Sequence, residues 1–131
     1  MSHEYSGSNG LFPPRRDLQT GMPTDPQERK EAPLATGCFD YFPDALVEIA
    51  KLSKIGNDKH NPGQPLHWSR DKSNDHADCL ARHFLQRGMI DRTGPKPVRH
   101  STQMAWRALA ILQLEIEASR KADADFDANI I

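Results

Sequence analysis

The chain has 131 residues, enough for one domain, and 37% of them are hydrophobic. Its 17 Lys and Arg residues nearly balance its 18 Asp and Glu residues, giving a formal net charge of -1. That balance excludes a general attraction to nucleic acid or to an anionic membrane, so any phosphate site must be local. No signal-peptide pattern opens the chain, and no apolar run approaches the roughly 18 residues of a membrane span. We therefore expect a cytoplasmic protein without nucleic-acid or membrane partners, in which Cys38 and Cys79 are free thiols.

The N-terminal part, residues 1–36, is rich in Pro, Gly, Ser, Thr and charged residues. No helical or strand period runs through it. This composition predicts a flexible N-terminal arm, and an arm that wraps a neighbouring subunit is the alternative.

The first predicted helix begins near Pro43, because proline suits the first helical position and places Asp44 in the first turn. Gly56 is the expected end of this helix. A loop over residues 56–68, rich in Gly, Pro and Asn, then ends on Trp68. The inward stripe of the helix is Leu46, Ile49, Ala50 and Ser53, with Val47 at its margin.

A second helix is predicted to start from Ser69 or Ser73, either of which suits an N-cap, and to stop at Gly88. Its expected core stripe follows the spacing i, i+3, i+4, i+7 and consists of Ala77, Leu80, Ala81 and Phe84. Residues 88–100 contain two glycines and two prolines and are expected to form a connection. No alternating run in the chain is long enough to predict a strand.

The third and longest helix is predicted from about Ser101 to Arg120, followed by a frayed acidic tail over 121–131. One face carries Met104, Ala105, Ala108, Leu109, Leu112 and Ile116, and further apolar residues lie elsewhere around the helix. Three helices of one chain cannot cover so much apolar circumference. We expect an all-α core over residues 37–120 that dimerises, with a tetramer of paired dimers as the assembly.

Carboxylates recur on one face of each of the first two helices. Asp44 and Glu48 are four residues apart, and Asp75 and Asp78 are three apart. Like charges at this spacing repel each other. A hard divalent cation such as Mg²⁺, bound between the two helices by the carboxylate oxygens, would offset that repulsion. The alternative is a solvated acidic surface, and spacing alone does not decide between the two.

Four stretches, taken in order, resemble a phage and bacterial family of dATP/dGTP diphosphohydrolases: FPDALVEIAKLSKIGNDKH, HW, SNDHADCLARHFLQRG and HSTQMAWRALAILQLE. That family is similar to the all-α MazG-like pyrophosphatases, and the nearest branch serves phages that replace adenine with 2-aminoadenine. The resemblance covers residues 37–117. It implies an oligomeric MazG-like helical bundle in bacterial or phage-infected cytoplasm. It also implies hydrolysis of a purine deoxynucleoside triphosphate, dGTP first (GTP in the ribonucleotide series), to the monophosphate and diphosphate.

The resemblance also implies roles for individual residues. Mg²⁺ or Mn²⁺ would be held by Glu48, Asp75 and Asp78, with Asp44 as a further ligand, and Glu48 and Asp78 would be catalytic. Phosphate contacts are assigned to Lys51, Lys54, Lys59 and Arg82, and base contacts to Asn61 and Trp68. For each of these phosphate-binding and nucleobase-binding residues the alternative is an ordinary structural role. Such a role is a surface charge for the Lys and Arg residues and a place in the core for Trp68.

Two rival interpretations remain. His76, Cys79 and His83, with Cys38, are residue types that bind zinc, but two histidines seven residues apart on a helix are separated by roughly 10 Å of rise. The second rival is a non-enzymatic helical adaptor or assembly protein, in which the broad apolar face of the third helix serves a partner. A test of metal-dependent activity separates the adaptor from the enzyme.

Overall fold

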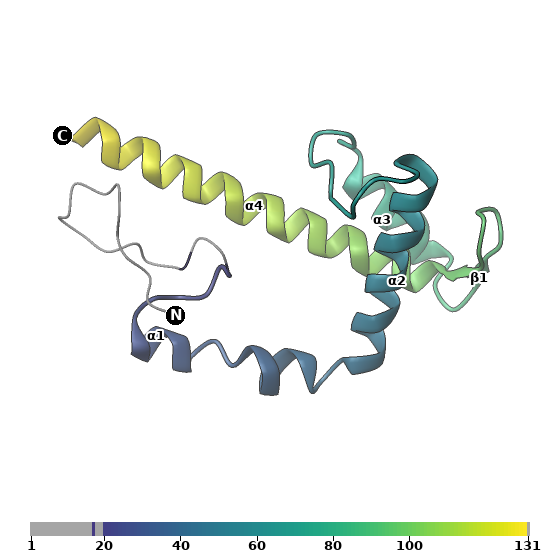
Figure 1. The fold of residues 1–131 in the computed structure, drawn as a ribbon, viewed down its shortest axis with the longest axis horizontal. Coiled ribbons are helices and arrows are strands. Elements are labelled where there is room, and N and C mark those ends of the chain that lie inside the picture. The colour runs from purple at the N-terminus through teal and green to yellow at the C-terminus, as the bar shows by residue number, and fades with distance from the viewer. Residues whose placement is uncertain (1–16, 18–19, 131) are drawn as a thin grey trace. The chain divides into compact units, whose positions relative to one another are not determined.

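The computed structural model describes residues 17 and 20–130 and is mostly helical (Figure 1). The helices are α1 (Pro26–Lys30), α2 (Pro43–His60), α3 (His76–Leu85) and α4 (His100–Ile130), with a π-helical turn over Ala35–Phe39. The strands β1 (Ile90–Asp91) and β2 (Val98–Arg99) form an antiparallel hairpin. The described residues up to Pro43 belong to one compact unit and those from Asp44 onward to a second. The mostly helical class is confirmed, and the hairpin corrects the prediction that no strand forms.

The first unit contains a short helix that the sequence did not predict. Asp25 caps α1 by accepting a hydrogen bond of 3.0 Å from the Glu28 N–H, and proline occupies the first turn. Five residues are too few to display a helical period, which explains why the composition alone suggested no element here. The predicted flexible arm also includes residues 1–16, 18 and 19, which lie outside the described residues.

Helix α2 begins at Pro43 as predicted but runs through Gly56 to His60. The helix stops where the sequence Asn61-Pro62-Gly63 follows, because a residue before proline disfavours helical geometry. Gly63 then adopts a φ of +77°, which favours glycine. The predicted end at Gly56 was therefore wrong, since a single glycine is tolerated inside a helix.

Helix α3 starts at His76, with Asp75 as its N-cap residue, a little later than either serine suggested. Its buried stripe consists of His76, Cys79 and His83. The predicted apolar stripe was wrong as an inward face, because Ala77, Ala81 and Phe84 are exposed and Leu80 is half-buried. Polar partners on α4 decided which face turns inward: His83 Nδ1 lies 2.8 Å from His100 Nδ1, and Arg107 Nη1 lies 2.9 Å from His76 Nδ1.

The hairpin pairs Ile90 with Arg99 and Asp91 with Val98. The Asp91 carboxylate accepts hydrogen bonds from the Thr93 N–H at 2.9 Å, the Thr93 hydroxyl at 2.6 Å and the Gln103 amide at 2.8 Å. These hydrogen bonds, with Thr93 first, hold the pKa of Asp91 far below its ordinary value. Asp91 thereby fixes the hairpin to the first turns of α4.

Helix α4 extends past its predicted end at Arg120 to Ile130, because no glycine or proline interrupts the segment and alanines favour the helix. It buries Thr102 and Ala110. Its predicted apolar face lies open in the single chain, with Leu109, Leu112 and Ile116 each at least 39% exposed. The excess of apolar surface that the sequence predicted is therefore present.

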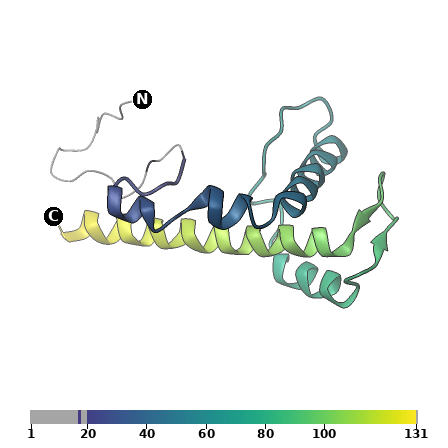
Figure 2. The same cartoon turned by 90° about the horizontal axis from the view of Figure 1, so that it is seen from below.

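Trp106 of α4 connects this helix to α2. Its indole N–H donates to Ser53 Oγ at 3.2 Å, and its ring meets Trp68 edge to face at 5.7 Å. Helices α2 and α3 lie on opposite sides of α4 (Figure 2). This arrangement determines which of the predicted site residues can meet.

The buried His83–His100 pair predicts a loss of stability in mild acid. Burial, the largest cause, and the neighbouring charge of Arg82 lower the pKa of His83 below its ordinary 6.5. The folded chain therefore favours neutral His83, and the unfolded chain binds more protons below pH 6.5. We expect the free energy of unfolding to be highest above that pH. It should fall as the pH drops from 7.5 to 5.5, by at most about 1.4 kcal/mol per pH unit.

Urea unfolding at several pH values checks this expectation. His83→Gln should flatten the dependence in this window. The carboxylates with lowered pKa values, including Asp75 and Glu117, lose their contributions only at lower pH. An unchanged slope in the variant would show that His83 is not the group responsible.

Candidate functional site

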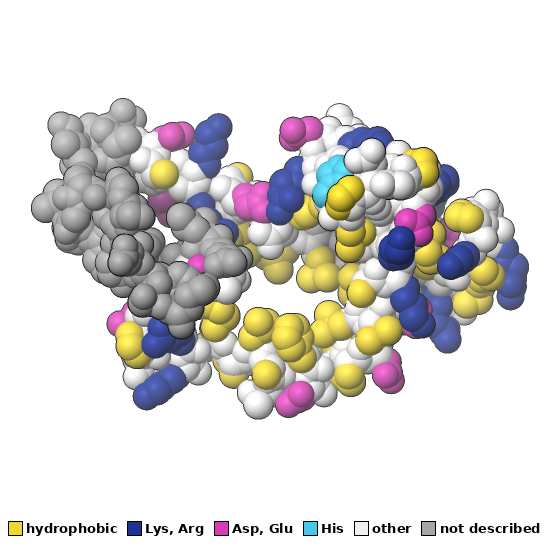
Figure 3. Space-filling model, viewed as in Figure 1, with side chains coloured by type: hydrophobic (Ala, Val, Ile, Leu, Met, Phe, Trp, Pro, Cys, Tyr) yellow, Lys and Arg dark blue, Asp and Glu magenta, His cyan; other side chains and the backbone are white. Residues whose placement is uncertain are grey.

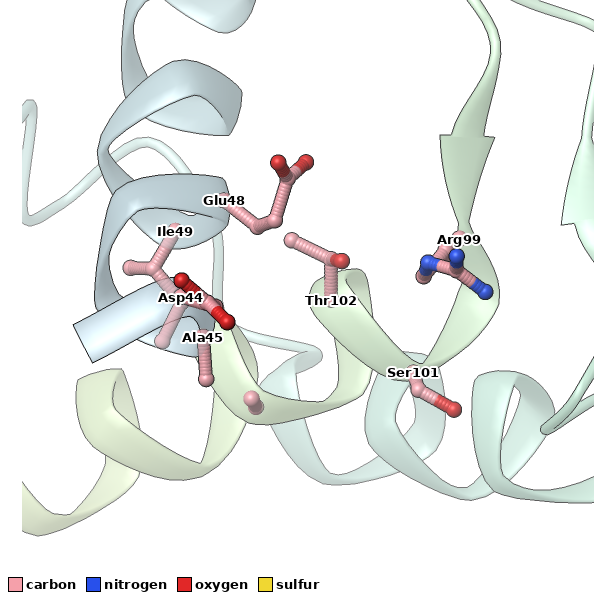
Figure 4. A pocket seen from close by; sticks show the side chains of 8 residues that line it. Asp44, Ala45, Glu48, Ile49, Arg99, Ser101 and Thr102 are labelled. Carbon is pink, nitrogen blue, oxygen red and sulfur yellow. The ribbon is translucent and has the colours of Figure 1, made fainter. Parts of the chain in front are cut away.

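An open hollow of about 390 Å³ lies between α2 and the start of α4 (Figure 4). It is lined by Asp44, Ala45, Glu48, Ile49, Arg99, Ser101, Thr102 and Ala105. The first four come from α2, Arg99 from the end of β2, and the last three from the first turns of α4. The site thus combines residues far apart in the sequence.

The α2 wall of the hollow carries two carboxylates. Asp44 and Glu48 lie one helical turn apart on one face, as their spacing predicted. Glu48 forms an ion pair of 3.1 Å with Lys51, and both side chains of that pair are well exposed. An exposed pair of this kind contributes little to stability, so a ligand can displace Lys51 at low cost.

A second hollow of about 350 Å³ shares Glu48 and Arg99 with the first and adds Lys51, Lys96 and apolar residues of α2 and the hairpin. We call the two hollows together the α2–hairpin groove. Lys and Arg side chains gather at this end of the molecule in the space-filling view (Figure 3). The groove therefore offers carboxylates for a cation and, beside them, bases for an anion.

The other predicted acids lie elsewhere. Asp75 and Asp78 belong to the start of α3, on the opposite side of α4 from Asp44 and Glu48 (Figure 2). The Asp75 carboxylate accepts from the Ser73 hydroxyl at 2.7 Å and the Cys79 thiol at 3.5 Å. These hydrogen bonds, with Ser73 first, lower its pKa. Asp78 is exposed.

The structure therefore separates the predicted metal ligands into two groups. Across the residues that it describes, no three His, Cys, Asp or Glu side chains gather to hold a metal ion. The alternative zinc ligands His76 and His83 share one buried stripe but pair with Arg107 and His100 respectively.

Asp44 and Glu48 are the residues of the groove with the oxygen donors that a hard divalent cation takes. Mg²⁺ keeps several waters and commonly takes one or two protein carboxylates together with phosphate oxygens of the substrate. The hollow offers two carboxylates on its α2 wall, with Arg99, Ser101 and Thr102 among its other lining residues. Such an ion would supply charge neutralisation at the phosphates.

The predicted phosphate-binding residues are distributed over several surfaces. Lys51 lines the α2–hairpin groove, whereas Lys54 pairs with Asp58 at 2.7 Å on the outer face of α2. Lys59 is exposed near the end of α2. Arg82 lies on α3, and its Nη2 lies 4.0 Å from the Cys79 sulfur. Of the four predicted bases, the structure places Lys51 in the groove.

The predicted base-binding residues lie in and after the loop that follows α2. Trp68 packs against Trp106 and carries the Arg70 guanidinium at 4.4 Å from its ring centre, so it belongs to an aromatic cluster. Asn61 is half-buried, and its main chain bonds to Asn57 and Gln64. Neither residue lines the groove.

Sequence reasoning missed Lys96, Arg99, Ser101 and Thr102 as site residues. Lys96 and Arg99 stand in a segment expected to be a plain connection, where no periodicity marks them. One available signal was the sequence Arg-His-Ser-Thr at a helix start, since a base preceding a free helix N-terminus suits an anion.

A groove that offers acids for a cation and bases for an anion suits a phosphorylated substrate. A family model described as dATP/dGTP diphosphohydrolase, N-terminal, matches residues 24–124. The match covers well over half of the chain, which therefore belongs to the dATP/dGTP diphosphohydrolase family. No curated protein and no solved structure matches the chain significantly. Within the described residues, no helix combines the length and apolar character needed to cross a membrane.

Proposed function

We propose that the chain hydrolyses a purine deoxynucleoside triphosphate to the monophosphate and diphosphate in a reaction that requires Mg²⁺ or Mn²⁺. Membership of the dATP/dGTP diphosphohydrolase family supports the reaction class. The observation that supports the location is the α2–hairpin groove, where Asp44 and Glu48 face Arg99 and Thr102. The preference for dGTP, and a role in phages with 2-aminoadenine DNA, rest on the sequence resemblance described above.

In this proposal, water attacks the α-phosphorus, the bond to the bridging oxygen breaks, and diphosphate leaves. Asp44 and Glu48 would hold the metal ion, and a nearby carboxylate would accept the proton of the attacking water. Lys51 would move from Glu48 to the phosphates. Asp75 and Asp78 are proposed as further ligands on the strength of the resemblance.

We also propose that the active form is a homo-oligomer. Several apolar residues of α3 and α4 are exposed in the single chain, between 39% and 79%: Phe84, Leu85, Leu109, Leu112 and Ile116. A second copy covering these faces would remove that apolar surface from water. A dimer or a tetramer of paired dimers satisfies this requirement.

Diphosphate release from each of the four dNTPs and four NTPs, with Mg²⁺ and with EDTA, tests the function. We expect metal-dependent release with a preference for purine deoxynucleotides and dGTP the best substrate. Sedimentation equilibrium on the same sample gives the assembly. Absence of release from all eight by a folded oligomer would favour the helical adaptor instead, and a monomer at working concentration would contradict the proposed assembly.

A further inference from the structure

The first turn of α4 presents backbone N–H groups beside the groove, and the Asp91 carboxylate of β1 bonds to Gln103 of the same turn. This helix has 31 residues and no acidic residue in its first turn. The first N–H groups of a helix have no acceptor within it, and together they favour an anion. The His100 N–H donates to the Met89 carbonyl at 3.1 Å. Among the described residues, no acceptor is recorded for the N–H groups of Ser101 and Thr102 outside the helix.

Thr102 provides a second, independent indication of a ligand. The residue is 8% exposed and lines the hollow. Its side chain is directed into the space between Glu48 and Arg99 (Figure 4). Within the described part of the chain, its hydroxyl has no hydrogen-bond partner. The hydroxyl is therefore free to bond to an oxygen of a ligand in the hollow.

Arg99 and Lys96 supply positive charge at the same place. Arg99 ends β2 directly before α4 and lines both hollows, and Lys96 lines the second. Neither forms an ion pair with another described residue. The planar fork of an arginine matches two phosphate oxygens, and lysine adds a compact charge.

We propose that Arg99, Lys96, the Thr102 hydroxyl and the first-turn N–H groups of α4 bind the two terminal phosphates, which leave as diphosphate. The identity of this anion rests on the proposed function. The α-phosphate then lies toward Asp44 and Glu48, on the facing wall. The leaving group is held by charge and N–H dipoles, while the carboxylates serve the attacked phosphorus.

Isothermal titration of the full chain with imidodiphosphate, which resists hydrolysis of its bridge, tests this subsite without turnover. We expect Arg99→Gln and Thr102→Val each to weaken binding by about tenfold or more, because a hydrogen bond to a charged group is lost. Thr102→Ser keeps the hydroxyl and should bind like the wild type. Arg92→Gln is the matched control, since Arg92 is an exposed hairpin base that lines neither hollow.

Circular dichroism of each variant verifies that the helices persist. Wild-type affinity in both Arg99→Gln and Thr102→Val, or equal weakening in Arg92→Gln, would overturn the subsite. Failure of the wild type to bind imidodiphosphate would overturn it as well. The proposed function is decided separately by diphosphate release from dNTPs. If the wild type hydrolyses dGTP and the Arg99 and Thr102 variants bind imidodiphosphate like the wild type, the proposed function stands and the subsite is wrong. If these variants weaken binding but the wild type hydrolyses no dNTP, the anion subsite stands and the proposed function is wrong.

Discussion

Glu48→Gln is expected to lower kcat for the preferred dNTP on the order of 100-fold or more, without changing the helical content. The substitution keeps the size of the side chain but removes the carboxylate at which the two hollows of the groove meet. Asp44→Asn should have the same direction of effect, since Asp44 shares that wall. Steady-state diphosphate release with saturating Mg²⁺ measures the loss, and circular dichroism checks the fold.

Asp58→Asn is the matched control for the acidic site. Asp58 is also an acid of α2, but it pairs with Lys54 on an exposed surface and lines neither hollow. Its replacement should leave kcat and KM unchanged. Equal losses in the Asp58 and Glu48 variants would mean that the effect comes from the charge of α2 as a whole, and the assignment of the groove would fail.

Asp78→Asn separates the two proposed groups of ligands. Asp78 lies on α3, across α4 from Glu48, and its role rests on the family resemblance. A loss as large as that of Glu48→Gln would mean that α3 completes the site, either in this chain or from a second copy. Full activity of Asp78→Asn would mean that Asp78 is not a metal ligand and that the carboxylates of α2 hold the ion.

Trp106→Ala is expected to destabilise the chain by about 3 kcal/mol, the low end for removal of a large aromatic side chain, because Trp106 is half-buried rather than fully buried. The substitution removes the hydrogen bond to Ser53 Oγ at 3.2 Å and the edge-to-face contact with Trp68. These contacts hold α2 against α4 and thereby shape the hollow between them. Activity should therefore fall together with stability.

Trp106→Phe distinguishes the two contributions of this side chain. Phenylalanine keeps an aromatic ring against Trp68 but cannot donate to Ser53, so we expect a loss of about 1 kcal/mol. Urea unfolding followed by circular dichroism, at one protein concentration for all variants, measures both values. A Trp106→Ala chain within about 0.5 kcal/mol of the wild type would show that this contact does not hold α2 in place.

Local sequence signals determined much of the secondary structure. Proline followed by an acid located the start of α2, and the long run without glycine or proline after Pro97 identified α4 as the longest helix. The four-residue spacing of Asp44 and Glu48 placed both on one face, as the structure shows. Each of these signals acts over a few residues, so the sequence expresses it directly. The order of the four motifs also sufficed to identify the family.

The tertiary structure decided which faces and segments meet. The sequence could not show that α3 turns its histidines and Cys79 inward, because the choice depends on His100 and Arg107 of another helix. The same limit applies to the groove: Arg99 and Thr102 line one hollow with Glu48 because of how α4 and α2 are placed in the fold. It applies again to α2 and α3, the helices that carry the two predicted groups of acids, which lie on opposite sides of α4. Periodicity determines which residues share a helix face, whereas the neighbour of that face is set by contacts between segments distant in sequence.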